Sequence, residues 1–294
     1  MGGLKNMGKK FDFKKLLTLD YILAGICIVV FVFNQMIGGY LMWGYWTYLI
    51  IAHRDFLCGF MGQLGVSNNH PNKAISWYKT AAKTTNSKVK YIRNYVYCEI
   101  KYGSVEDADK NLNKIIKMRE NNNQFKGQDI VDLQMIRALL EWKKGDIDKA
   151  IEILEVPFAE DKSREIYTTI AYMKTIKDDV DESLRFSKEA YEKFEDDILV
   201  KSIYAINLYK NGEKEVAEGI LKELCEGMYN IPDTFYFYAL LLMEKDNKEE
   251  AIIMINRGIK LLKSTIITII EPEVYTELLK SLEKEEFKKM EEVV

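Results

Sequence analysis

Proline, histidine and cysteine are scarce in this chain. Its 294 residues include 4 prolines, 4 cysteines and 2 histidines, together with 17 glycines. Because proline and glycine interrupt regular elements, so few of them favour helices over a turn-rich β fold. The cysteines show no C-x-x-C pair and no histidine at ligand spacing, which argues against a disulfide framework or a metal site. Free thiols suit a reducing compartment.

Sequence motifs typical of catalytic and nucleotide-binding sites are also missing. The sequence has no H-E-x-x-H, G-x-x-x-x-G-K-[ST], G-x-S-x-G or G-x-G-x-x-G pattern, and these patterns mark common metallopeptidase, nucleotide-binding and hydrolase sites. Acidic pairs such as Glu106-Asp107 fit helix starts, where the helix dipole favours carboxylates. We therefore expect a protein that is not an enzyme, with no catalytic residue, no metal, no cofactor and no small-molecule substrate.

Charge is absent from one long stretch. No charged residue occurs from Tyr21 to Ala52, a run of 32 residues, whereas about 20 apolar residues suffice to cross a bilayer. We therefore predict a transmembrane segment over residues 16–54. Residues 1–15 form a basic tail, which the positive-inside bias places in the cytoplasm. The net charge of −3, with both signs abundant, gives no indication of a nucleic acid partner.

The uncharged stretch is compatible with two crossings or one. A hairpin would run over residues 16–33, turn at the Asn34-Gln35 and Gly38-Gly39 pairs, and return over about 40–58. A single helix would run over about 21–42, followed by an interfacial belt of Trp43, Tyr45, Trp46 and Tyr48. The hairpin returns the chain to the cytoplasm, where a lysine-rich part follows, whereas a single pass would export the remainder. We favour the hairpin.

A pattern of small residues recurs after residue 54. Its clearest column has separations of 34, 42, 33, 34 and 34 residues and consists of Ala74, Ala108, Ala150, Ser183, Ala217 and Ala251. Twelve positions before these anchors stand Gly62, Val96, Ala138, Ala171, Ala205 and Ala239. Five positions before them stand residues that tolerate a left-handed backbone, namely Asn69, Gly103, Gly145, Asp178, Gly212 and Asp246. N-cap formers follow in four units, at Ser104, Asp146, Asp179 and Asn247. The pattern therefore predicts that each repeat unit forms a helix, a tight turn and a second helix.

This unit resembles the tetratricopeptide repeat, whose period is 34 residues. The resemblance covers residues 55–263 and is most specific in second helices such as "AISWYKTA" and "AIIMINRG". It implies an all-α fold class, an α-solenoid of about six helix pairs that follows the transmembrane hairpin. An insertion of about eight residues around "RENNNQFKGQ" predicts one lengthened loop.

Residues 264–294 are expected to cap the solenoid, because such arrays need a terminal element with a polar outer face. Four isoleucines should pack on the last repeat, namely Ile266, Ile267, Ile269 and Ile270. The following helix should carry its apolar side chains on one face, at Val274, Leu278, Leu282 and Phe287.

The resemblance also implies a binding groove, because the first helix of each pair lines the concave side in this family. The positions that face the groove in this family correspond in this sequence to Arg93, Tyr97, Leu139, Trp142, Tyr172, Ile206, Tyr209, Tyr236 and Leu240. We expect no carboxylate clamp, since Lys90, Arg93 and Asn94 all fall in one repeat. An apolar peptide or an amphipathic helix is the predicted ligand. Packing against neighbouring helices is the alternative explanation of these side chains.

The sequence thus predicts a membrane-tethered scaffold that binds a protein or peptide partner, with its repeats on the cytoplasmic side of the cell membrane. This arrangement looks similar to membrane-anchored tetratricopeptide proteins of bacteria. The alternative is a single-pass, chaperone-like protein associated with a translocon, whose repeats lie outside the cytoplasm. A repeat-based regulator is disfavoured, because the apolar segment occupies the place of a DNA-binding helix-turn-helix.

Overall fold

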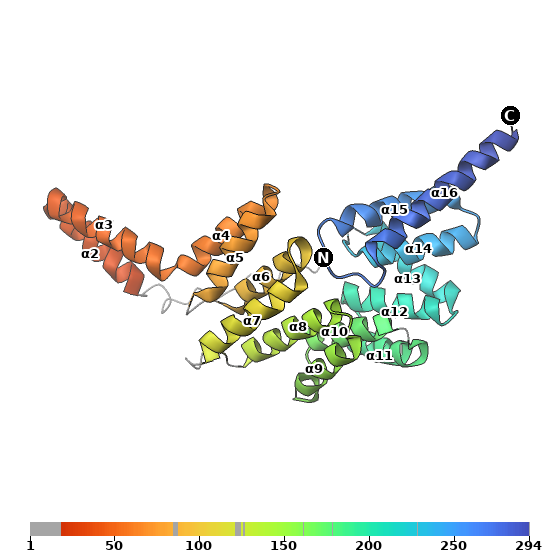
Figure 1. Ribbon diagram of the computed structural model, residues 1–294, viewed down its shortest axis with the longest axis horizontal. Helices are drawn as coiled ribbons and strands as arrows, with labels where there is room; N and C mark the ends of the chain where they lie inside the picture. Colours follow the sequence, from red (N-terminus) through yellow and green to blue (C-terminus); the bar gives the residue numbers. More distant parts are fainter. Residues whose placement is uncertain are drawn as a thin grey trace, which may run out of the picture. The chain divides into compact units, whose positions relative to one another are not determined.

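The computed structural model describes residues 19–84, 88–120, 125, 127–160, 162–177, 179–227 and 229–293. The predicted basic tail, the first residues of the predicted hairpin (16–18), most of the predicted lengthened loop and Asp178 lie outside the described residues. The described part contains fifteen helices and no strand (Figure 1). The predicted all-α fold class is therefore confirmed.

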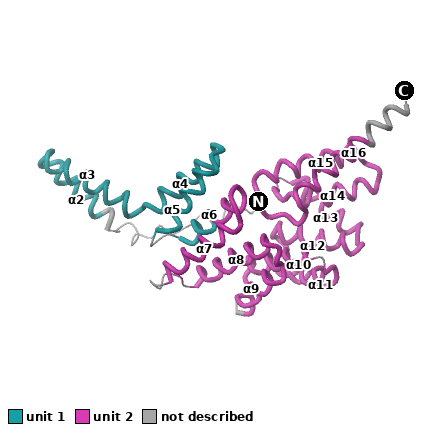
Figure 2. The backbone as a smooth tube through the Cα atoms, in the orientation of Figure 1, with its two compact units in different colours: residues 1–95 teal, residues 96–294 magenta. Residues whose placement is uncertain are grey.

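The chain divides into two compact units, residues 1–95 and residues 96–294 (Figure 2). This boundary falls inside a helix and was not predicted. The helices of the first unit are α2 (Leu19–Phe33), α3 (Gln35–Ala52), α4 (Arg54–Ser67), α5 (Pro71–Lys83) and the start of α6 (Val89–Tyr102). Those of the second unit are the remainder of α6, α7 (Val105–Glu120), α8 (Gln128–Lys143), α9 (Ile147–Glu160), α10 (Arg164–Lys177), α11 (Val180–Lys193), α12 (Ile198–Lys210), α13 (Lys214–Glu226), α14 (Pro232–Glu244), α15 (Lys248–Leu262) and α16 (Pro272–Val293).

Helices α2 and α3 form a hairpin, because the chain turns at Asn34. The Asn34 side chain accepts hydrogen bonds from the backbone N–H groups of Met36 and Ile37, both at 3.1 Å, and so caps α3. Gly38 lies directly against the backbone of Phe31, where a Cβ atom would stand 2.1 Å from Cα. The two helices therefore touch backbone to backbone, and a single continuous helix over residues 21–42 is not formed.

None of the helices that the structure describes has both the length and the apolar character needed to cross a membrane. Helix α2 has 15 residues, which span about 22 Å, whereas the hydrocarbon core of a bilayer is roughly 30 Å thick. Helix α3 has 18 residues, but its glycine, tyrosine, tryptophan and threonine residues lower its hydropathy. The predicted transmembrane hairpin is therefore not supported, because the turn at Asn34 divides the uncharged run into two shorter pieces.

Six helix pairs follow, from α4/α5 to α14/α15, and each contains one small anchor residue in its second helix. All six anchors are buried, with at most 1% of their surface exposed. The six residues twelve positions earlier are buried as well. In the first pair, a Cβ atom on Gly65 would stand 2.9 Å from the backbone nitrogen of the anchor Ala74. The small columns therefore mark places where paired helices approach too closely for larger side chains.

The turns within the pairs have the predicted backbone geometry at four of the five described positions. A positive φ occurs at Asn69 (56°), Gly145 (94°), Gly212 (87°) and Asp246 (57°), but not at Gly103. All four predicted N-cap side chains accept a hydrogen bond from the backbone N–H three residues on, at 3.0 to 3.4 Å, namely Ser104, Asp146, Asp179 and Asn247. Local turn chemistry thus defines where each second helix begins.

The terminal helix α16 packs on α15, but Tyr275 occupies the buried side of its first turn, where Val274 was predicted. Tyr275 is fully buried and lies against Gly258 of α15, whereas Val274 is exposed. Leu282 is fully buried as predicted, Leu278 is partly buried, and the side chain of Phe287 lies outside the described residues. A polar phenol can occupy the buried side because its hydroxyl finds an acceptor, described below.

Two glycines in one helix pair predict opposite effects on stability. Gly212 has a φ of 87°, so Gly212→Ala should cost about 1–2 kcal/mol through backbone strain. Gly219 lies in the middle of α13 with open space around it, so Gly219→Ala should stabilise by about 0.5–1 kcal/mol. Urea unfolding followed by circular dichroism measures both. Effects of the same sign would contradict the assigned turn.

Candidate functional site

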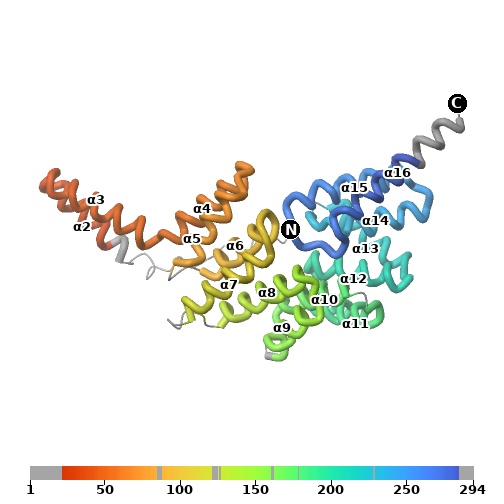
Figure 3. The backbone as a smooth tube through the Cα atoms, viewed as in Figure 1, coloured from red at the N-terminus to blue at the C-terminus, as the bar shows by residue number. Residues whose placement is uncertain are grey.

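The first helices of successive pairs lie next to one another in the second unit, with α10 against α12 and α12 against α14. Residues 263–271 connect α15 to α16 without regular secondary structure (Figure 3). Their isoleucines and backbone contact these helices. We call residues 263–271 the covering segment. We call the side of α8, α10, α12 and α14 that it contacts the inner face. This face corresponds to the predicted groove.

The covering segment packs into the inner face through its isoleucines. Ile267 and Ile269 pack against a buried cluster to which Trp142 also contributes, formed by Ala171, Tyr172 and Ile203. Ile269 and Ile270 also pack against the large core cluster of α12 to α16. Two of the four isoleucines therefore extend beyond the last repeat, on which all four were expected to pack, and reach α10 and α12. The chain itself thus covers part of the surface that was predicted to bind a partner.

Asp233, the second residue of α14, holds the covering segment in place. Its carboxylate is 1% exposed. Oδ1 accepts hydrogen bonds from the backbone N–H groups of Ile269 (3.0 Å) and Ile270 (3.2 Å) and from the Tyr275 hydroxyl (3.0 Å). Oδ2 accepts one from the Tyr172 hydroxyl at 2.9 Å. One side chain therefore connects α10, α14, the covering segment and α16.

The electrostatics of this cluster follow from its burial. Burial raises the pKa of the Asp233 carboxyl, and the four hydrogen bonds favour the ionised form and act in the opposite direction. Burial, reinforced by the charge of Asp233, raises the pKa of the Tyr172 hydroxyl well above its ordinary value. Lys143 is a cationic group that interacts with Asp233, and its pKa is lowered by burial although Glu271 and Asp233 act to raise it. Tyr172 therefore stays protonated and acts as a donor.

The predicted groove residues have different surroundings. Four are buried within the fold, namely Leu139, Tyr172, Ile206 and Tyr236. Tyr97, Trp142, Tyr209 and Leu240 are partly buried, and Arg93, which belongs to the first unit, is exposed. The Tyr209 hydroxyl donates to Glu244 at 3.2 Å, and burial raises its pKa to about 12. The role of these residues in partner binding stays a prediction.

Asp233 and Tyr275 are the residues that the sequence patterns missed. An aspartate directly after Pro232 has the ordinary composition of a helix start, where its charge would face solvent. Only the arrival of the covering segment, 36 and 37 residues later in the chain, turns this position into a buried acceptor. The run "IITII" was the available signal, because consecutive β-branched residues disfavour a helix.

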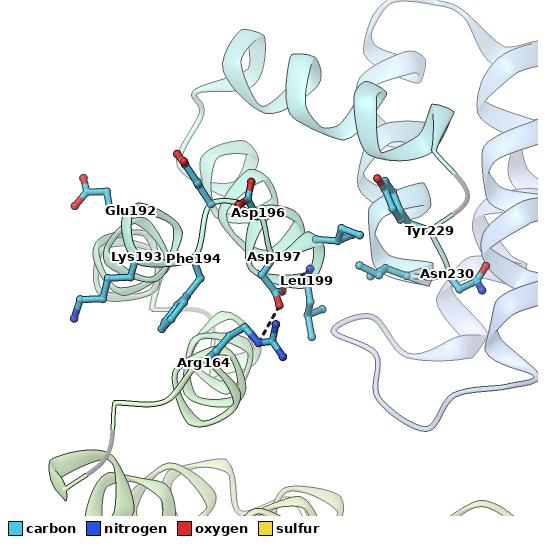
Figure 4. A pocket seen from close by; sticks show the side chains of 12 residues that line it. Arg164, Glu192, Lys193, Phe194, Asp196, Asp197, Leu199, Tyr229 and Asn230 are labelled. Carbon is cyan, nitrogen blue, oxygen red and sulfur yellow. Dashed lines mark hydrogen bonds and ion pairs between the residues drawn. The ribbon is translucent and has the colours of Figure 1, made fainter. Parts of the chain in front are cut away.

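A separate hollow lies in the second unit where α11 joins α12 and α13 joins α14. It has a volume of about 900 Å³, and its lining includes Arg164, Asp197 and Tyr229 (Figure 4). Arg164 pairs with Asp197 at 3.4 Å, and Asp197 in turn caps α12 by accepting from the N–H groups of Leu199 and Val200. These polar groups stabilise the connection between helix pairs, which explains the hollow without a ligand.

All four cysteines are buried. Burial raises the pKa of the Cys98 thiol to about 11 and that of Cys225 to about 12. Since the thiolate is the reactive form, we expect the folded chain to react slowly with thiol reagents at neutral pH.

Comparison with known proteins supports the fold. No protein-family model and no curated protein matches this sequence. The solved structure of a tetratricopeptide repeat protein from Parabacteroides merdae is similar, with a TM-score of 0.57 and 14% identity over 90% of this chain and 98% of that one. YrrB, a tetratricopeptide protein described as having an unusual peptide-binding site, has a TM-score of 0.37 and 14% identity over 65% of this chain and 94% of its own.

The likeness to the Parabacteroides merdae structure covers nearly the whole of both chains. This chain therefore has the fold of tetratricopeptide repeat proteins, as the repeated pattern of small residues predicted.

Removing the Asp233 carboxylate should destabilise the second unit strongly. Asp233→Ala would leave two buried hydroxyl groups and two backbone N–H groups without their acceptor, at a cost of about 3–5 kcal/mol. Urea unfolding measures the loss, and protease cleavage within residues 263–271 should become faster. Glu277→Ala, at an exposed site on α16, is the matched control. A loss no larger than that of the control would show that the cluster does not hold the segment.

Proposed function

We propose that this chain is a membrane-tethered scaffold for protein–protein interaction and has no catalytic activity of its own. The observation that carries the proposal is the junction of two features in one chain. A tetratricopeptide fold, which generally presents helix surfaces to other proteins, follows directly on a helical hairpin whose outer surface is apolar. The repeats would supply the binding surface and the hairpin would hold it at a bilayer.

The tether is supported by the apolar side chains that the hairpin leaves exposed. Phe33 is 85% exposed and Val32 is 73% exposed. Soluble proteins rarely display large contiguous apolar patches unless something binds them. The exposed set also includes Ile22, Ile26, Ile28, Val29, Phe31, Met36, Ile37, Tyr40, Leu41, Trp43, Trp46, Ile50 and Ile51. A lipid surface is the occupant we assign, because from Tyr21 to Val66 only Arg54 and Asp55 are charged.

We further propose that the hairpin enters the bilayer from one face, tip first, without crossing it. Backbone polar groups in hydrocarbon must be paired within the protein. At the tip, Asn34 donates its N–H to the Val30 carbonyl and accepts from the Gly38 N–H, both at 2.8 Å, and its side chain caps two further N–H groups. Such a tip can lie in an apolar medium at low cost.

This insertion would place the repeats on the same side as the N-terminal tail, because a hairpin returns the chain to the face from which it entered. The tail contains five lysines, Lys5, Lys9, Lys10, Lys14 and Lys15, and lysine is enriched on the cytoplasmic side of membranes. We therefore propose that the repeats are cytoplasmic. The alternative is a translocon-associated, chaperone-like protein with its repeats outside the cytoplasm.

Charge at the hairpin tip should abolish membrane binding. Val32→Lys together with Phe33→Lys would each place a charge in hydrocarbon, so the full chain should no longer float with liposomes of mixed neutral and anionic lipid. Ile253→Lys is the matched control, because Ile253 is an exposed apolar residue (56%) on α15 of the second unit. Flotation of both variants, or of neither, would refute the tether.

A cysteine at Leu240, a predicted groove position, tests the scaffold and its side of the membrane together. The native thiols are buried, so a new thiol at Leu240→Cys should be the reactive one. A membrane-permeant thiol–photoreactive cross-linker should trap a protein partner in intact cells, whereas Ile253→Cys should not. A membrane-impermeant version should trap nothing.

Each other outcome has a definite meaning. Adducts formed with the impermeant reagent would replace the cytoplasmic scaffold by the extracytoplasmic alternative. Adducts that are equally abundant at both positions, or absent at both, would show that the inner face is not the partner-binding surface.

A further inference from the structure

The covering segment has the contacts of a bound peptide. It has no regular secondary structure between two helices and bends at Ile266, Ile269 and Ile270, and it meets the inner face through Ile267 and Ile269. Its backbone is held by a fixed acceptor, since Asp233 receives two consecutive N–H groups. At its start, Lys101 of α6 donates to the Lys263 carbonyl. In peptide recognition, main-chain hydrogen bonds supply affinity and side-chain contacts supply specificity, and this segment makes both kinds of contact.

The segment is also less firmly embedded than the helices around it. Ile266, Ile267, Ile269 and Ile270 are all only partly buried, and Thr268, the buried residue of the segment, is 6% exposed, whereas the helix anchors are at most 1% exposed. Helix α16 has its own contacts with α15 through Tyr275 and Leu282. Both ends of the segment would therefore stay attached if residues 264–271 moved away. Elements with few buried contacts open locally at a lower free-energy cost than the core.

We propose that the inner face is a peptide site for a non-helical segment rich in β-branched apolar residues, which the chain's own residues 263–271 occupy until a protein partner replaces them. This inference rests on the scaffold function proposed above and names the ligand of that scaffold. The ligand has isoleucine or valine at two alternate positions, and free N–H groups at the second of these and at the residue after it. Proline at either N–H position would be excluded, because it has no N–H to donate to Asp233.

The tethered segment explains why the site would bind only selected partners. A segment attached at both ends competes at an effective concentration in the millimolar range. A free peptide with the same contacts would therefore bind the unaltered chain weakly, because the affinity is reduced by the fraction of molecules in which the site is open. Weakening the chain's own segment should raise the apparent affinity for a free peptide without any change in the site.

The experiment uses the full chain in detergent micelles and a fluorescent synthetic peptide with the sequence of residues 262–272. The double variant Ile267→Ser with Ile269→Ser weakens the covering segment and leaves the inner face intact. Fluorescence anisotropy should show at least about tenfold tighter binding to this variant than to the unaltered chain. Ile253→Ser, on the exposed side of α15, should bind as weakly as the unaltered chain.

The role of Asp233 is tested on the peptide, so that the protein stays the same. Methylation of the two nitrogens that correspond to Ile269 and Ile270 removes the N–H donors and should abolish binding to the double variant. Methylation at the position of Ile266, outside the Asp233 contact, should leave binding within about threefold. An equal loss of binding with both methylated peptides would show that Asp233 does not recognise the two backbone N–H groups.

Two results would overturn the inference. One is a double variant that keeps its helical spectrum and binds the peptide no better than the unaltered chain, which would make the segment a permanent part of the core. The other is equally tight binding to both proteins, which would place the peptide elsewhere. Neither result changes the outcome expected of the cross-linking experiment at residue 240. The two experiments therefore distinguish a wrong assignment of the ligand from a wrong assignment of the scaffold function.

Discussion

The arrangement of the second unit depends on a single buried carboxylate. Asp233 accepts from two backbone N–H groups of the covering segment, from Tyr172 on α10 and from Tyr275 on α16. A buried carboxylate is tolerated only when its oxygens are well paired. Asp233 meets this condition through residues that are 42 and 61 positions away in the chain. The same four bonds that make its burial possible place the isoleucines of residues 263–271 on the inner face.

This constraint changes the meaning of the predicted groove. Tetratricopeptide folds offer a face on the first helices, and here part of that face is already covered by residues 263–271 of the same chain. Tyr172, expected to meet a partner, gives its hydroxyl to Asp233 instead. If the inner face is a peptide site, as proposed, a partner has to match an internal competitor. The chemistry of that competitor, alternate isoleucines with two consecutive N–H donors, is the most specific guide to the ligand.

The N-terminal hairpin is governed by a different requirement. Its outer surface is apolar almost throughout, and its polar backbone at Asn34 is paired within the hairpin. The same turn divides the uncharged run into two helices, and neither is both long and apolar enough to cross a membrane. Lipid contact from one face satisfies both observations. It would bring the repeats close to a membrane surface, where a high local concentration can offset a modest affinity.

The sequence by itself determined the features that depend on neighbours within a few residues. Turn glycines and asparagines such as Gly145 and Asn69 predicted the left-handed turns, capping residues such as Asp146 predicted the helix starts, and the column of small anchors predicted the paired helices. Gly103 is the exception, and its backbone stays outside the left-handed region. These predictions succeeded because backbone sterics and capping act locally, and because six repetitions of one pattern strengthen each other.

Only the tertiary structure decided what occupies the inner face and which residues hold it there. The sequence showed an ordinary helix-start aspartate at position 233 and an isoleucine-rich run at 266–270, with nothing to indicate that they meet. Their contact depends on how far the stacked pairs from α6 to α15 carry the end of the array, since Lys101 and Lys263 are brought together across 162 positions. The course of the array from α6 to α15 results from many packing angles between helices. Burial of Asp233 is its consequence, and no local pattern contains it.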